Sequence, residues 1–186
     1  VENWDKTVTM VPTYSMVTES FKNWRSMQEA GARRIMRSVL IDVTSVKFCT
    51  EELLERYKKI QYIEEYLMSK EAEIETYNQQ HHIDVSSPVN GRRMTNLGVF
   101  RAYLESYLKN HPHIHKKAMI MVRQLDLQES GLSIEIYAFA DTTDWAEYEC
   151  IQADIFDHIF AVIPEFDLRI YQQPSGYDLR SIGSSN

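Results

Sequence analysis

The chain has 186 residues, of which 44% are hydrophobic and 25% charged, a composition typical of one globular domain with room for an insertion or a partial second unit. Its net charge is −7 and its basic residues run no longer than pairs, which argues against nucleic-acid binding because phosphate contacts need a basic face. No stretch approaches the roughly 20 consecutive apolar residues of a membrane helix, and Cys49 and Cys150 lie far apart without a C-x-x-C partner, which favours buried, inert thiols in a reducing compartment.

The first region, residues 1–32, opens with the segment DKTVTMVP, in which residues 8–11 predict a β-branched strand ended by Pro12. An amphipathic or turn-like stretch follows, and the sequence QEAGA then indicates a linker that contains Gly31. This region is too short to bury a core alone, and no partner for its strand is evident downstream. Because the chain also begins at Val1 without a methionine, we expect it to be a piece of a longer protein.

The second region begins with the segment RRIMRSVLID at residues 33–42, where apolar and polar side chains alternate and predict a strand. Apolar residues then recur at spacings of three and four, which predicts one long helix with Thr50 as its N-cap and a solvated face rich in Glu and Lys. The apolar positions of this helix are Leu53, Leu54, Tyr57, Ile60, Ile63, Tyr66 and Leu67. Residues 78–93 follow as a loop, and its adjacent His81 and His82 point in different directions, which favours loop residues over metal ligands.

The third region has the most regular pattern. Residues 95–110 predict a helix capped by Thr95 or Asn96, and residues 116–126 and 131–141 predict a β-hairpin. Residues 143–163 predict a second helix that Asp144 caps, and residues 166–173 predict a last strand. Together with the strand near residue 34, the order β, inserted helix, α, β, β, α, β predicts an α+β, ferredoxin-like split βαβ sandwich with a helical insertion.

Three groups of residues are candidate chemical sites. The segment NHPHIHKK places His111, His113 and His115 at alternate positions, but no nearby Cys or Asp-x-His pattern completes a zinc site, so we expect a link between a helix and a strand. Asp154, Asp157 and His158 share a helix and favour a polar helix face over a metal site.

The sulfur atoms of Met119 and Met121, which share a strand face, are expected to pack in the core rather than to serve a metal or a partner. The chain also lacks a phosphate-binding glycine motif and any set of nucleophile, base and oxyanion hole.

The chain resembles the family of small-conductance mechanosensitive channels, the MscS family, at several places. The segment DKTVTMVP followed by FKNWR is similar to the end of the family's middle β domain, although Thr13 stands where many members carry Asn. Residues 116–176, including the aromatic Trp145 after DTTD and the helix that ends before IPEFDLRI, are similar to the family's C-terminal α/β domain. The insertion at about residues 44–94 points to the branch of the miniconductance channel.

This resemblance implies the cytoplasmic vestibule domain of a channel in the bacterial inner membrane that opens under membrane tension in hypoosmotic shock. Residues 1–32 would end the middle β domain and its linker, residues 33–176 would form the α/β C-terminal domain, and residues 177–186 would form a tail. The domain would have a structural role in a homo-heptameric ring through which solutes and ions pass. Membrane contact would come from helices upstream of Val1.

The resemblance also implies that no residue performs chemistry, so we expect no catalytic, cofactor-binding or metal-binding residues and no cofactor. The alternative interpretation is a free-standing ferredoxin-like regulatory or metal-binding module, since that fold hosts many unrelated functions. A convergent polar pocket or a histidine-bound ion would favour this alternative. An enzyme ranks third because no catalytic constellation is evident in the sequence.

Overall fold

The computed structural model describes the chain apart from residues 1, 3–5, 19–30 and 174–186. The chain divides into two compact units, Val1–Gly31 and Ala32–Asn186. In the described part of the first unit, an isolated bridge joins Glu2 to Val8 and the short helix α1 spans Ser15–Thr18.

The strand predicted for residues 8–11 is therefore wrong beyond Val8, and the side chain of Met10 is 93% exposed. A β-branched run forms a stable strand only when a neighbouring strand pairs with it. The FKNWR segment, which carries part of the family resemblance, lies outside the described residues.

The second unit is built on an antiparallel sheet of three strands in the order β1-β3-β2. Strand β1 spans Arg33–Ile41, β2 spans Met121–Gln128 and β3 spans Gly131–Ala140. The alternation predicted for β1 is confirmed, because Ile35, Val39 and Ile41 are buried. Strand β3 lies in the centre and pairs with both neighbours.

The segment after the last helix lies along the free edge of β1. Ile170 forms a bridge with Ile41, the Asp42 N–H donates to the Arg169 carbonyl (2.8 Å) and the Tyr171 N–H donates to the Leu40 carbonyl (2.9 Å). The resulting spatial order is that of a split βαβ sheet, so the predicted fold class is confirmed.

The last strand is shorter than the predicted range of residues 166–173. Residues Ile163–Phe166 form a 3-10 helix, η2, and Asp167 adopts a left-handed conformation with φ of 53°. The chain becomes extended only after this turn, so one bridge remains of the predicted strand.

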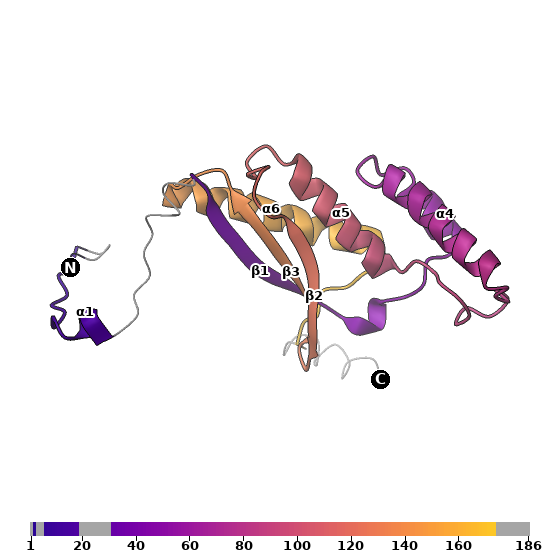
Figure 1. Ribbon diagram of the computed structural model, residues 1–186, viewed down its shortest axis with the longest axis horizontal. Helices are drawn as coiled ribbons and strands as arrows, with labels where there is room; N and C mark the ends of the chain where they lie inside the picture. Colours follow the sequence, from indigo (N-terminus) through magenta and orange to yellow (C-terminus); the bar gives the residue numbers. More distant parts are fainter. Residues whose placement is uncertain (1, 3–5, 19–30, 174–186) are drawn as a thin grey trace, which may run out of the picture. The chain divides into compact units, whose positions relative to one another are not determined.

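Two helices pack on one side of the sheet (Figure 1). Helix α5 spans Asn96–Asn110 and α6 spans Trp145–Val162, close to the predicted ranges. Their N-caps are Thr95, which accepts from the Gly98 N–H, and Asp144, which accepts from the Glu147 N–H, as side-chain caps should. The core between sheet and helices includes Ile35, Ile41, Phe100, Leu104, Leu108, Ile134, Ile136, Ile155, Ile159 and Phe166.

The insertion contains two helices, so the prediction of one long helix is wrong. The 3-10 helix η1 (Val43–Ser45) follows β1, α3 spans Glu51–Tyr57 behind the predicted Thr50 cap, and α4 spans Glu64–Gln80. The buried pairs Leu53/Tyr57 and Ile63/Leu67 explain the break. At about 100° per residue, Tyr57 and Ile63 of one continuous helix would point about 120° apart, whereas the break lets both pairs face the core.

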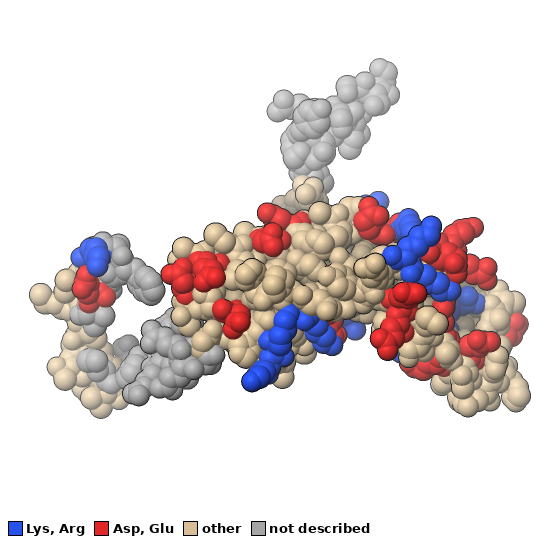
Figure 2. All heavy atoms as spheres, turned by 90° about the horizontal axis from the view of Figure 1, so that it is seen from above, with Lys and Arg blue, Asp and Glu red and all other residues tan. Residues whose placement is uncertain are grey.

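The two ends of the insertion lie side by side. Phe48 and Thr95 form an antiparallel bridge, the Cys49 N–H donates to the Met94 carbonyl (2.9 Å) and the Asn96 N–H donates to the Lys47 carbonyl (3.0 Å). The insertion's surface mixes both charges, as the right-hand end of Figure 2 shows. Its ion pairs are Lys58–Glu55, Lys58–Glu71, Lys70–Glu73 and Arg92–Glu73.

Candidate functional site

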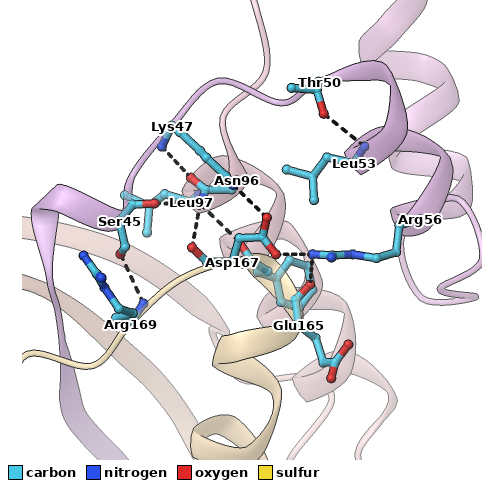
Figure 3. Close-up of polar contacts among 11 residues, drawn as sticks. Ser45, Lys47, Thr50, Leu53, Arg56, Asn96, Leu97, Glu165, Asp167 and Arg169 are labelled. Atoms are coloured by element: carbon cyan, nitrogen blue, oxygen red, sulfur yellow. Dashed lines mark hydrogen bonds and ion pairs between the residues drawn. The ribbon is translucent and has the colours of Figure 1, made fainter.

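A buried amide joins three segments that are far apart in the sequence (Figure 3). Asn96, the first residue of α5, has no exposed surface. Its Oδ1 accepts from the N–H groups of Lys47 and Leu97, both at 2.9 Å. Its Nδ2 donates to the carbonyl oxygens of Ser45 (3.0 Å) and Phe166 (3.1 Å). We call these residues, with Asp167, the Asn96 joint.

The carboxylate of Asp167 adds charge to the edge of the joint. It pairs with Lys47 (2.8 Å) from the start of the insertion and with Arg56 (2.5 Å) from α3. Hydrogen bonds from Arg56 and then Lys47 lower the pKa of Asp167 below its ordinary value. Arg56 also donates to the Glu165 carbonyl (2.8 Å), so one guanidinium ties α3 to the segment after α6.

A smaller set of contacts fixes the end of β1. The Ser45 hydroxyl donates to the Asp42 carbonyl (2.6 Å) and accepts from the Arg169 N–H (3.1 Å). The Arg169 side chain pairs with the Asp42 carboxylate (3.0 Å) and donates to the Thr44 hydroxyl (2.9 Å). The arrangement holds β1, the insertion, α5 and the last segment in one geometry.

Sequence reasoning proposed Asn96 only as a possible helix cap and missed the joint. The cap is Thr95, and Asn96 instead points into the interior. The available signal was a polar residue at the start of a helix with an apolar face. If such an amide is buried, all its hydrogen-bonding atoms need partners. Apart from Leu97, the partners named above lie 49 to 70 residues from Asn96, which no local pattern reveals.

The three alternating histidines occupy the link from α5 to β2, as predicted, and the structure separates their roles. The His111 ring is 7% exposed, with its Nε2 3.7 Å from an Asp154 carboxylate oxygen. The His113 ring lies 5.9 Å from it, whereas the His115 N–H donates to the Phe139 carbonyl (2.8 Å) next to the sheet. Within the described ranges, no group of three His, Cys, Asp or Glu residues is placed to hold a metal ion.

An aromatic cluster links α5 to α6 beside His111. The Tyr103 hydroxyl lies 2.8 Å from His158 Nε2, and the His158 ring stacks on Tyr107 with centroids 4.2 Å apart. Burial lowers the pKa of His158 and of His111, in both cases against the opposing effect of Asp154. Asp154 and Asp157 are exposed on the side of α6 opposite the buried isoleucines, as predicted, whereas His158 is half-buried against the tyrosines.

The remaining predicted positions are scattered. His81 stacks on Tyr77 within the insertion, and both cysteines are free. Burial raises the pKa of Cys49 to about 11, but Cys150 is exposed on α6, so the prediction of two buried thiols is wrong for Cys150. Core packing is wrong for Met119, which is 64% exposed.

An open groove lies within the insertion, between α3, α4 and the loop after α4. Apolar Leu54 and Ile74 share its wall with the carboxylates of Glu71 and Glu75 and with Arg93. Because groups of both charges line an open surface, the groove does not define one class of ligand.

Comparison with known proteins identifies the class of domain to which this fold belongs. Residues 95–170 match the family model described as "Mechanosensitive ion channel MscS, C-terminal". The chain is also similar to the Low conductance mechanosensitive channel YnaI of Escherichia coli strain K12, with 33% identity over 67 residues. That segment covers 36% of this chain and 20% of the relative, so the chain spans about a fifth of the relative's length.

Residues 95–170 are thus similar to the C-terminal domain of an ion-channel family. This match and the similarity to the E. coli channel confirm the resemblance to MscS-type mechanosensitive channels seen in the sequence. In the residues that the structure describes, no helix is both long enough and apolar enough to span a membrane.

Proposed function

We propose that this chain is the cytoplasmic vestibule region of a tension-gated channel in the bacterial inner membrane. The single observation that carries the proposal is the family match over residues 95–170, which covers α5, the β2–β3 hairpin, α6 and the segment that returns to β1. The named function of the similar E. coli protein, a low conductance mechanosensitive channel, supports the same conclusion. This match also favours the channel over a free-standing regulatory or metal-binding module.

The role of the chain in that channel is structural. It assembles a homo-oligomeric ring, which we propose to be a heptamer, and it forms the wall of a vestibule through which solutes pass after hypoosmotic shock. Residues 1–32 end the preceding β domain, residues 33–176 form the α/β domain, and the chain contributes no catalytic, cofactor or metal-binding residue. The insertion at about residues 44–94 supports a place in the miniconductance branch.

The segment that matches the family model begins and ends close to the Asn96 joint. Thr95 precedes Asn96, and Ile170 lies three residues beyond Asp167 and forms a bridge with Ile41. The joint therefore fastens the insertion to the part of the domain that resembles known channels. This position favours a structural role for the insertion over a chemical one.

Patch-clamp recording of the complete gene product, in a host without its own tension-gated channels, tests the proposal. We expect currents that appear only under suction and that increase with membrane tension. Native mass spectrometry of the purified channel should give the mass of seven subunits. Silent patches at lytic tension, with membrane insertion confirmed, would refute the channel function.

A further inference from the structure

One face of the sheet carries no helix of the described part of the second unit (Figure 1). On β1, the Arg37 guanidinium stacks on Phe156 of α6 at 4.5 Å and Ile35 is fully buried, so the odd-numbered positions face the helices. Because side chains alternate along a strand, Met36 points to the opposite face. Its pairing partner Tyr137 on β3 faces the same way, as does Met121 on β2.

This second face is defined by four apolar residues and one ion pair, and we call it the open sheet face. Met36, Tyr137 and Met121 form one row across the three strands. The Phe139 ring packs edge-on against Tyr137 with centroids 5.6 Å apart. Met36 is 50% exposed, although it stands in the middle of a strand of a folded domain.

The next row of the open sheet face contains an ion pair. Glu135 on the central strand is only 5% exposed, and its carboxylate lies 2.6 Å from the Arg123 guanidinium of β2. Arg34 adds a second guanidinium, 5.9 Å from the Tyr137 ring centroid. The open sheet face thus combines adaptable methionines and aromatic rings with two arginines, a composition typical of contact surfaces between proteins.

The opposite side of the same unit carries a surface of complementary character. Along α6, the side chains that point away from the sheet follow one helical stripe, which we call the outer stripe: Ala146, Cys150, Ala153, Asp157 and Phe160. All five are exposed. Three small side chains let another surface approach the helix backbone, Phe160 offers an apolar group that is 41% exposed, and Asp157 supplies a negative charge.

We propose that the open sheet face of one copy of this chain packs against the outer stripe of α6 on the next copy. The inference rests on the proposed channel function, in which several copies of the chain form a ring. The charges are complementary, because Arg34 of one copy would meet Asp157 of the other, whereas Arg123 is already paired with Glu135. The two surfaces lie on opposite sides of one unit, so each copy can use both at once, and such a head-to-tail contact builds a ring when the rotation between copies closes.

Cysteine crosslinking of the full chain tests this contact, since Cys150 already stands in the outer stripe. In a Cys49→Ala background, Met36→Cys should crosslink to Cys150 of the next copy with a short bismaleimide and produce a ladder of dimers, trimers and larger species. The ladder should vanish when Cys150→Ala is added. Met68→Cys is the matched control, because Met68 on α4 is 62% exposed and lies away from both surfaces.

Charge insertion gives a second, independent measurement. Sedimentation equilibrium of the full chain should show that Met36→Glu weakens self-association by about tenfold or more, because a carboxylate is placed at the centre of the contact. Met68→Glu should leave the association constant unchanged. Circular dichroism of both variants verifies that the fold is intact.

Each other outcome overturns the contact. Dimers that persist without Cys150 would show that two open sheet faces pair with each other. Crosslinking within one chain, to cysteines placed at residues 8–11, would show that the chain's own first unit covers the face. A chain that stays monomeric at the highest attainable concentration, or that associates without the crosslinked ladder, would also refute the contact. Tension-activated currents from the complete gene product would still support the channel function in that case.

Discussion

Replacing Asn96 by alanine removes its buried amide. This change should destabilise the domain more than any other single polar change in the joint. Asn96→Ala removes the partners of the Lys47 and Leu97 N–H groups and of the Ser45 and Phe166 carbonyl oxygens. At about 1 kcal/mol of net stability for each bond, the expected loss is about 4 kcal/mol. That loss is a large share of the roughly 5–15 kcal/mol that stabilises a typical domain.

Equilibrium unfolding in urea, followed by far-UV circular dichroism, measures this loss as a shift of the midpoint at constant slope. Asn78→Ala is the control, because Asn78 makes a similar pair of bonds to the Arg92 main chain (3.0 and 2.9 Å) in the half-exposed insertion. Water replaces those bonds more readily, so we expect a loss of about 1 kcal/mol.

A volume-conserving variant separates hydrogen bonding from packing. Asn96→Asp keeps the shape but turns the donor group toward the carbonyl oxygens of Ser45 and Phe166 into an acceptor. It should lose at least as much stability as Asn96→Ala at neutral pH, because one oxygen of a buried, charged carboxylate would face two carbonyl oxygens without a donor. The reasoning is refuted if Asn96→Ala costs less than about 1 kcal/mol or no more than Asn78→Ala.

Three further changes test other parts of the structure. Thr50→Ala should cost about 1 kcal/mol in urea unfolding, because it removes the cap of α3, whose hydroxyl accepts from the Leu53 N–H. The ion pairs of Asp167 hold its pKa in the folded state below the ordinary value of 3.8, so they stabilise the fold above that pH. This stability is lost as the pH falls further, and Asp167→Asn should flatten this acid limb of the stability curve. His158 has a folded-state pKa below 6.5, so the unfolded chain takes up the proton first and stability should fall as the pH drops from about 7 to about 5. His158→Phe keeps the stacking on Tyr107 and should reduce that fall, and an unchanged pH profile would contradict the assignment.

Local patterns in the sequence predicted the elements whose causes are local. Thr95 and Asp144 mark the starts of α5 and α6 because side-chain caps act within three residues, and the alternation in β1 follows from its single buried face. The break between α3 and α4 was missed because spacing alone does not tell which apolar positions are buried together. Tyr57 and Ile63 take their orientation from tertiary contacts, not from propensity.

The candidate site was less accessible to prediction than the fold. The partners of Asn96 come from segments on either side of α5, and the left-handed turn at Asp167 shortens a strand whose apolar pattern is otherwise sound. The orientation of Met119 and Met121 was also misjudged, since alternation along a strand shows that two residues share a face but not whether helices cover it.

The bridge between Phe48 and Thr95 means that the insertion leaves and rejoins the domain at one point. The free-energy cost of closing a loop rises only with the logarithm of its length, about 0.6 kcal/mol for each doubling, so the exposed loop after α4 can lengthen or accept a fluorescent or epitope tag at small cost to the fold. A short turn between Phe48 and Thr95 would cost more, because it would also remove Tyr57, Ile63 and Leu67 from the core.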